Sequence, residues 1–423
     1  MNKIYFIGIG GIGVSALARF YLEKGWEVSG SDICRSKITD DLEKQGIKVV
    51  IGQKEDNISN NFDLIVFSPA IKESNPELKK AREMNLKTLS YPQALGEITK
   101  EYFTIAVSGT HGKSTTTAML SLILIKAGFD PTVIIGTKLK EFNDSNYRGG
   151  KSKYLIIEAC EHEASFLNYW PQIIVITNIE ADHLDYYGNL ENIKKSFKEF
   201  VSHLKENGVL IKRNDVEIEF PRTIEFSLEE KDVLKDVLKV PGEHNILNGL
   251  AAFKTARVLG IDDNVSFSAL SQYQGAWRRM EETKLPDFVL IDDYAHHPTE
   301  IKATLKAIRE KYPRQKIYCV FQPHQYQRTK LLFNDFVLAF KEAISQKLVD
   351  KLMFIDVYDV KGREGSEEDK KYNSEMLAKA VSAQYIEEKL LKKEIEGGEV
   401  VIMMGAGDIY NLSEELKGRC CII

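Results

Sequence analysis

The sequence predicts an α/β protein made of three domains in tandem. With 423 residues, the chain is longer than one hydrophobic core usually organises. Apolar, strand-like runs alternate with helix-like stretches along it, which is the rhythm of parallel sheets. Two glycine-rich loops, each between a strand-like run and a helix-like run, indicate nucleotide-type domains.

The first domain is expected over residues 1–98, where KIYFIGIG, WEVSGSD, IKVVIG and DLIVFSP alternate with helical stretches such as VSALARFYLEKG. This pattern predicts a Rossmann-like domain. A central domain over 99–283 contains YFTIAVSG, YLIIEA and QIIVITNIE, which predict a P-loop-type ATPase with a mostly parallel sheet. A second Rossmann-like domain over 284–423 contains DFVLIDDYA, KIYCVFQPH, KLMFIDVYD and VVIMMGAGD.

The composition narrows the class of function. The chain is 43% hydrophobic and 28% charged, as is usual for a globular protein, and its formal charge of -5 gives no basic field for nucleic acid. Neither a signal-peptide pattern nor a run of about 18 apolar residues is present, so we expect no membrane association. Five cysteines without CxxC spacing favour a reducing, cytoplasmic location over disulfides or zinc.

The first glycine loop follows the strand KIYFI and opens a helix, so its amides can receive a diphosphate. Asp32 ends the next strand and could hold a ribose. From these residues alone the ligand stays open, because a nicotinamide dinucleotide and UDP share both groups, and a purely structural turn is the third possibility. The phosphate-binding glycines are Gly8, Gly10, Gly11 and Gly13.

The second loop predicts ATP binding. Lys113 is placed to contact the terminal phosphates and Ser114 to hold magnesium. The spacing is that of a shortened P-loop, because Val107 stands where the standard motif has glycine. A helix-capping turn is the weaker explanation, since capping does not require Gly-Lys-Ser together. The loop comprises Gly109, Thr110, His111, Gly112, Lys113, Ser114 and Thr115.

Acidic residues and a histidine end the next two strands of the central domain. Carboxylates at strand ends are usually just solvated, but beside a phosphate loop they favour a magnesium site, because magnesium prefers oxygen ligands. The histidine could complete a second metal position. The residues concerned are Glu158, Cys160 and Glu161 after one strand, and Glu180, Asp182, His183 and Asp185 after the other.

Read together, these loops and several later segments resemble the Mur ligase family over nearly the whole chain. The segments that carry the resemblance are GIGGIGVSALA (8–18), SPAIKESNPEL (68–78), SGTHGKSTTTAML (108–120), EASFLN (163–168), TNIEADHLDYYGN (177–189), VPGEHNILNGLAA (240–252), YQGAWRRMEE (273–282), IDDYAHHPTEI (291–301), VFQPHQYQRT (320–329) and MGAGDIY (404–410).

The resemblance implies an ATP-dependent ligase of peptidoglycan precursor synthesis. Its reaction would join the lactyl carboxylate of UDP-N-acetylmuramate to L-alanine through an acyl phosphate, with ATP and Mg²⁺ as cofactors. The first glycine loop would then hold UDP, which removes the nicotinamide interpretation. Such an enzyme would be a monomer or homodimer, and closure of the C-terminal domain would complete the site.

The resemblance also implies roles for particular residues. Catalysis would depend on Lys113, Glu158, His183 and Arg279, and the metal would be held by Ser114, Glu158 and His183. Besides the second loop, ATP would be contacted by Asn248, Arg279 and Asp293. The substrates would be contacted by the first-loop glycines and by Ser15, Asp32, Ser68, Asn178, His297, His324 and Arg328.

The chain departs from the family pattern in three places. Cys160 stands where the family has aspartate, Gln325 stands where many relatives have arginine, and the segment 205–241 is short. The aspartate's role is not moved to Cys160, because a protonated thiol is a poor magnesium ligand. No carbamylated lysine is assigned, although Lys194, Lys195 and Lys198 lie near the expected position.

Two alternatives within this resemblance stay open. A recycling ligase would attach a whole tripeptide to the same UDP-sugar, although FQPHQYQRT favours the alanine enzyme. A non-catalytic UDP-sugar-binding homologue would explain Cys160 and the short central segment as signs of lost activity.

Overall fold

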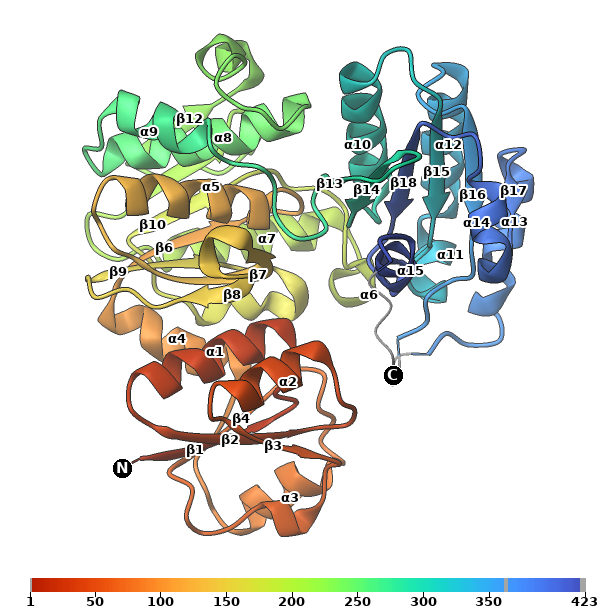
Figure 1. Cartoon of the computed structure of the whole chain (residues 1–423). Coiled ribbons are helices and arrows are strands. Elements are labelled where there is room, and N and C mark those ends of the chain that lie inside the picture. The colour runs from red at the N-terminus through yellow and green to blue at the C-terminus, as the bar shows by residue number, and fades with distance from the viewer. Residues whose placement is uncertain (1, 361–363, 419–423) are drawn as a thin grey trace. The chain divides into compact units, whose positions relative to one another are not determined.

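The computed structural model describes residues 2–360 and 364–418. It contains three sheets in two compact units. The N-terminal unit comprises Met1–Val237 and Leu247–Gln272 and holds the first two sheets. The C-terminal unit comprises Leu238–Ile246 and Tyr273–Ile423 and holds the third. Figure 1 shows helices packed on the sheets in each unit.

The first sheet is parallel, in the order β3-β2-β1-β4-β5, which is half of a doubly wound fold. Side chains alternate along β1, so that one face packs on α1 and α2 and the other on α3. The elements are β1 (Lys3–Ile7), α1 (Ile12–Glu23), β2 (Glu27–Asp32), α2 (Lys37–Lys44), β3 (Lys48–Ile51), η1 (Glu55–Asn57), β4 (Leu64–Phe67), α3 (Pro76–Glu83), β5 (Thr88–Ser90) and α4 (Tyr91–Glu101).

The second sheet has the order β12-β11-β10-β6-β9-β7-β8, with only its edge strand β8 antiparallel. The short segment 205–241 forms the opposite edge. The elements are β6 (Phe103–Ser108), α5 (Lys113–Lys126), β7 (Thr132–Leu139), η2 (Lys140–Phe142), β8 (Ser145–Arg148), β9 (Tyr154–Glu158), η3 (His162–Asn168), β10 (Ile173–Ile176), α6 (Leu184–Tyr187), α7 (Leu190–Ser202), β11 (Val209–Arg213), β12 (Thr223–Phe226), η4 (Leu228–Val233), α8 (Glu243–Val258) and α9 (Asp263–Leu270).

The third sheet has the order β13-β14-β18-β15-β16-β17, parallel except for β13. α10, α12 and α13 cover one face, and α14 and α15 cover the other. The elements are β13 (Glu281–Lys284), β14 (Val289–Asp293), α10 (Pro298–Lys311), β15 (Ile317–Phe321), α11 (Tyr326–Leu331), α12 (Phe333–Ser345), β16 (Lys351–Phe354), η5 (Asp369–Lys371), α13 (Ser374–Ala380), β17 (Gln384–Tyr385), η6 (Glu388–Leu390), α14 (Leu391–Glu394), β18 (Val400–Met404) and α15 (Ile409–Leu416).

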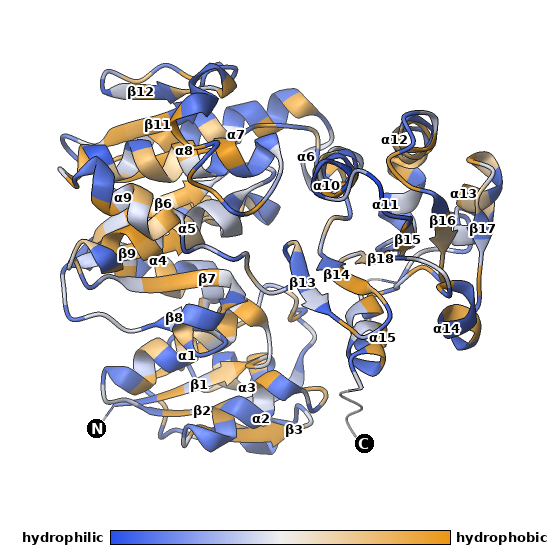
Figure 2. Ribbon diagram, turned by 45° about the horizontal axis from the view of Figure 1, so that its top comes forward, coloured by the Kyte–Doolittle hydropathy of each residue, from blue (hydrophilic) through white to orange (hydrophobic). Residues whose placement is uncertain are grey.

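The predicted fold class is therefore confirmed: three α/β domains with mostly parallel sheets. The exact domain edges at 98/99 and 283/284 stay predictions. Strands such as β1, β11 and β14 are largely apolar, as Figure 2 shows by their orange colour. Within the described residues, no helix combines the length and the apolar character needed to cross a bilayer.

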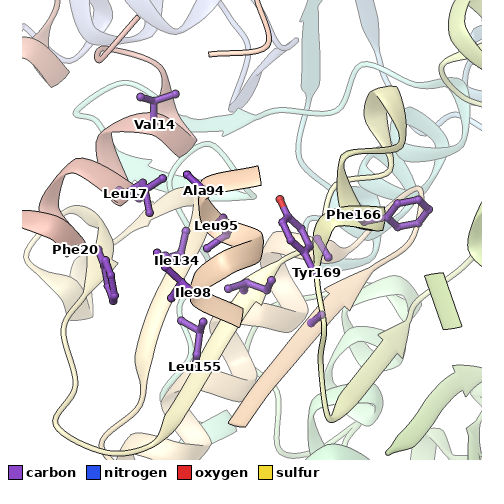
Figure 3. Packing of buried hydrophobic residues seen from close by; sticks show 14 of the residues in the cluster. Val14, Leu17, Phe20, Ala94, Leu95, Ile98, Ile134, Leu155, Phe166 and Tyr169 are labelled. Carbon is purple, nitrogen blue, oxygen red and sulfur yellow. The ribbon is translucent and has the colours of Figure 1, made fainter. Parts of the chain in front are cut away.

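One apolar core joins the first domain to the central sheet. Leu17 of α1, Leu95 of α4, and Ile134 and Leu155 of β7 and β9 all belong to the same buried cluster (Figure 3). Each of these side chains is at most 2% exposed. The helix that follows the first glycine loop therefore packs directly against the domain that carries the second.

This continuous core predicts that a cavity within it destabilises the N-terminal unit. Replacing Leu95, which is fully buried, with alanine is expected to lower the free energy of unfolding by about 2 to 5 kcal/mol. The shift of the urea transition measures this loss. As a matched control, Leu390→Ala removes a side chain that is 42% exposed and should change stability by less than about 0.5 kcal/mol. Equal effects of the two substitutions would contradict the packing described.

Candidate active site

The second glycine loop connects β6 to α5 in a conformation that requires glycine. Gly109 and Gly112 have φ angles of 131° and 84°. A Cβ atom on Gly109 would lie 2.1 Å from Thr177 Oγ1, and one on Gly112 would lie 2.2 Å from Asn248 Oδ1. The structure therefore places Asn248 against this loop, and its contact with ATP stays a prediction.

The strand end after β10 holds the loop in place. The amide of His111 donates to Asn178 Oδ1 at 2.9 Å, and Asn178 Nδ2 donates back to the His111 carbonyl at 2.9 Å. A second N–H of Asn178 reaches Thr177 Oγ1 at 3.3 Å. The side chain of Asn178 thus pairs with this loop, and its contact with the UDP-sugar stays a prediction. Sequence spacing gave no sign of this pairing.

Lys113 begins α5 and forms a buried ion pair. Its Nζ donates to the carbonyls of Gly109 and Thr110 at 2.6 and 3.0 Å, and lies 3.0 Å from Glu161 Oε2. Burial favours the neutral amine, but the nearby carboxylate outweighs it, so the pKa of Lys113 is raised. Glu161, which is 2% exposed, is thus the counter-ion of the loop lysine.

The predicted metal ligands surround this ion pair at the ends of β9 and β10. His183 Nε2 lies 3.9 Å from Glu161 Oε1 and 3.8 Å from Asp182 Oδ2. Glu158 accepts a hydrogen bond of 2.8 Å from the amide of Gly136. Ser114, which is 3% exposed, lies in the first turn of α5. Carboxylates, a hydroxyl and an imidazole are donors that fit a divalent cation beside phosphates.

Cys160 lies inside this cluster as a neutral group. Burial, and to a lesser extent the Glu161 carboxylate, raises the pKa of its thiol to about 12. A protonated thiol does not replace an aspartate as a magnesium ligand. The structure thus agrees with leaving Cys160 out of the candidate metal set.

The first glycine loop has the geometry of an anion site. The amides of Gly8 and Ile9 both donate to the Ser31 carbonyl at 2.9 Å, and the amide of Gly10 donates to Asp32 Oδ2 at 2.8 Å. α1 begins after Gly11, which provides no side-chain cap, so its first-turn amides remain for a ligand. Asp32 shapes the loop, and its contact with a ribose stays a prediction.

Two further predicted substrate residues lie beside this loop in different settings. A Cβ atom on Gly8 would lie 3.1 Å from the Cβ atom of Ser68, so Ser68 borders the loop directly. Ser15 is completely buried, and its hydroxyl donates to the Ile12 carbonyl at 2.9 Å and accepts from Asn146 Nδ2 at 3.1 Å. This geometry does not support a direct substrate contact for Ser15.

The predicted ATP residues of the C-terminal unit are held by local contacts. Asp293 accepts hydrogen bonds from the amides of Met280 and Ala295 at 2.8 and 2.9 Å. Arg279 lies over the ring of Tyr294, 5.0 Å from its centroid, and 4.0 Å from Glu300. Their roles toward ATP stay predictions, because these contacts describe the C-terminal unit by itself.

Arg278 is a structural residue that sequence reasoning missed. Arg278, next to Arg279 in the sequence, is 7% exposed, and its guanidinium donates to the carbonyls of Gly405 and Gly407 at 2.5 and 2.9 Å. It therefore ties the MGAGD loop to the segment that carries Arg279. The only sequence signal was its place beside Arg279.

The residues expected to receive the amino acid occupy two local settings. His297 caps α10, where its Nδ1 accepts a 3.3 Å hydrogen bond from the Thr299 amide. His324 stacks on Tyr358, with 5.6 Å between ring centroids, and Arg328 follows in α11. Gln325, which stands where many relatives have arginine, lies between His324 and Arg328. Its φ of 65° places this residue in the left-handed region of backbone conformation.

Comparison with known proteins identifies one family along the chain. Its domain models match in order: "Mur ligase family, catalytic domain" over 3–103, "Mur ligase middle domain" over 107–234 and "Mur ligase, glutamate ligase domain" over 278–407. The UDP-N-acetylmuramate–L-alanine ligase of Acetivibrio thermocellus is 41% identical, over 98% of this chain and 95% of that protein. The enzyme of the same name from Clostridium kluyveri is 39% identical, over 98% and 97%.

A solved structure agrees with these sequence matches. The UDP-N-acetylmuramate-alanine ligase of Thermotoga maritima superposes with a TM-score of 0.82 at 28% identity, and the match covers 99% of each chain. The similarity therefore includes all three domains.

His324 makes a testable contribution to the pH dependence of stability. Burial, aided by the nearby His296 and Arg328, lowers its pKa to about 3, whereas an unfolded histidine titrates near 6.5. As the pH falls from 7 to 5, the unfolded chain gains a proton that folded His324 does not, so stability is lost. His324→Asn should reduce this loss by about 1 to 2 kcal/mol, measured by urea unfolding at both pH values. An unchanged loss would show that His324 is protonated in the folded protein.

Proposed function

Because the chain belongs to the Mur ligase family, we propose that it is the ligase that joins L-alanine to the lactyl carboxylate of UDP-N-acetylmuramate in peptidoglycan precursor synthesis. The family match and the relatives establish an ATP-dependent ligase. The observation that carries the proposal is the buried Lys113 cation in a glycine loop, surrounded by Glu158, Glu161 and His183.

The charges of this cluster suit activation of a carboxylate. A carboxylate is a poor acyl donor, so transfer of the γ-phosphoryl group from ATP to its oxygen creates an acyl phosphate and releases ADP. The amine of L-alanine then attacks the carbonyl carbon, and phosphate leaves. Lys113 provides positive charge beside the phosphoryl group during transfer. Glu161 pairs with the same ammonium group at 3.0 Å, so phosphate oxygens would compete with this carboxylate for it.

The metal assignment forms part of the proposal. Ser114, Glu158 and His183 would hold Mg²⁺. A magnesium ion bound there would offset the negative charge of the phosphates. Glu158 is fixed by the Gly136 amide, and Cys160 adds no charge, so the cluster has oxygen donors without a competing thiolate. The first-turn amides of α1 would receive the UDP diphosphate, with Asp32 and Ser68 beside it.

Several finer assignments belong to the proposal alone. Arg279 and Asp293 would contact ATP, and His297, His324 and Arg328 would guide the amino acid. The cytoplasmic location and the monomeric or dimeric state also stay predictions.

The function is tested by phosphate release from ATP and Mg²⁺ with UDP-N-acetylmuramate and L-alanine. Lys113→Ala is expected to lower kcat by about a thousandfold or more, because it removes the cation beside the transferred phosphoryl group. Lys126→Ala is the matched control, since Lys126 is an exposed lysine at the other end of the same helix. Release that requires no UDP-sugar, or that survives in Lys113→Ala, would contradict the proposal.

The same assay separates the alternatives by the amine supplied. Reactions with L-alanine, L-serine, glycine and the tripeptide are compared at equal concentration. Dependence on L-alanine supports the proposal, whereas dependence on the tripeptide would identify a recycling ligase. If none of the amines supports turnover, a non-catalytic UDP-sugar-binding homologue is favoured.

Cys160→Asp tests the electrostatics of the cluster. A third carboxylate beside Glu158 and Glu161 should lower the Tm without metal, since like charges repel. It should also lower the Mg²⁺ concentration for half-maximal activity by about threefold to tenfold. Cys160→Ser, which adds no charge, is the control. Activity that appears only in Cys160→Asp would instead identify the native protein as a non-catalytic homologue.

A further inference from the structure

Polar contacts join the β7–β8 hairpin to the start of α1 and to Glu158 at the end of β9. Asn146 of β8 is 2% exposed, and both the nitrogen and the oxygen of its side-chain amide are hydrogen-bonded. Its Nδ2 donates to the Ile12 carbonyl and, at 3.1 Å, to Ser15 Oγ, both in the first turn of α1. Its Oδ1 accepts a hydrogen bond of 2.9 Å from Arg19, which lies four residues beyond Ser15 in α1. A side chain of the central domain thus forms hydrogen bonds to the helix that begins at the first loop.

The same hairpin holds the metal-ligand candidate of the second site. The pairing of β7 with β8 is irregular between Ile134 and Leu139, and Gly136 lies within this irregular stretch. Its amide donates to Glu158 Oε2 at 2.8 Å, and a Cβ atom on Gly136 would lie 2.9 Å from that oxygen. Irregular pairing beside an active site commonly redirects a backbone group. One hairpin therefore contacts α1 at one point and Glu158 at another.

The apolar core keeps these points at a fixed separation. Val14 and Leu17 of α1 pack in one buried cluster with Ile134 of β7 (Figure 3). A close-packed interior transmits a displacement instead of absorbing it. Asn146 supplies the directional part of this contact, because hydrogen bonds to the first turn fix the position of the helix start along its axis.

We propose that Asn146 is a positioning residue, which sets the first glycine loop relative to Glu158. The inference rests on the proposed function, in which the loop holds the UDP-sugar and Glu158 the metal. Asn146 touches neither. Its effect is to place the lactyl carboxylate of a bound UDP-sugar at the correct distance from the phosphoryl group, so its loss impairs UDP-sugar binding and turnover together.

Asn146→Asp separates this role from simple packing. The substitution keeps the volume and the acceptor for Arg19, but it replaces the Nδ2 donor with an oxygen that faces the Ile12 carbonyl. We expect KM for UDP-N-acetylmuramate to rise about tenfold and kcat to fall about tenfold. The dissociation constant of ATP, measured without UDP-sugar, should stay within about twofold, because the second loop is not touched.

The matched control is Asn143→Asp, the same chemical change at an exposed position of the same hairpin. It should retain the constants of the wild type. Asn146→Ser, which retains a hydroxyl donor, serves as the second variant if Asn146→Asp does not fold. A lower Tm with unchanged kinetic constants, or an equal loss of ATP affinity, would overturn the positioning role. A wild type without UDP-sugar-dependent turnover would instead contradict the proposed function.

Discussion

The arrangement of the candidate active site follows from the need to neutralise one buried ammonium group. Lys113 cannot occupy the start of α5 as a cation without an anionic partner, and Glu161 provides it at 3.0 Å. That requirement brings the segment after β9 against the loop after β6, which are neighbouring parallel strands. His183, after β10 on the other side of β6, lies close to the same carboxylate. The proposed catalytic groups therefore gather because adjacent parallel strands end at one edge.

The first glycine loop is stabilised in a different way from the second, since it contains no charged side chain. Its shape comes from backbone amides that donate to Ser31 and Asp32, and α1 starts without a side-chain cap. A helix start of this kind attracts an anion but is poorly fixed by itself. The central domain fixes the position of this helix start in two ways: α1 packs on β7 in the buried core, and the side-chain amide of Asn146 bonds to the first turn of α1. The two glycine loops thus differ in chemistry and share one scaffold.

Sequence reasoning reached those features that depend on local spacing. Glycines between a strand and a helix predicted both loops, and acidic residues at strand ends predicted the cluster around Glu158 and His183. It could not predict side-chain hydrogen bonds between residues that are distant in the sequence. Asn146 and Ser15, for example, lie 131 positions apart. Asn178 and Ser15 illustrate the same limit, because a motif gives the position of a side chain but not the direction in which it points.

Cys160 limits the number of negative charges that the folded protein has to balance in this cluster. Glu158 and Glu161 flank it in sequence, and the carboxylate of Glu161 is almost completely buried beside a single lysine. An aspartate between them would add charge that only a cation could offset, whereas the neutral thiol adds none. The neutral thiol therefore suits the charge balance of the cluster without a bound cation. An aspartate would suit the charge balance of the cluster with bound metal. The residue at position 160 therefore changes the number of negative charges that the cluster has to balance with and without a bound cation.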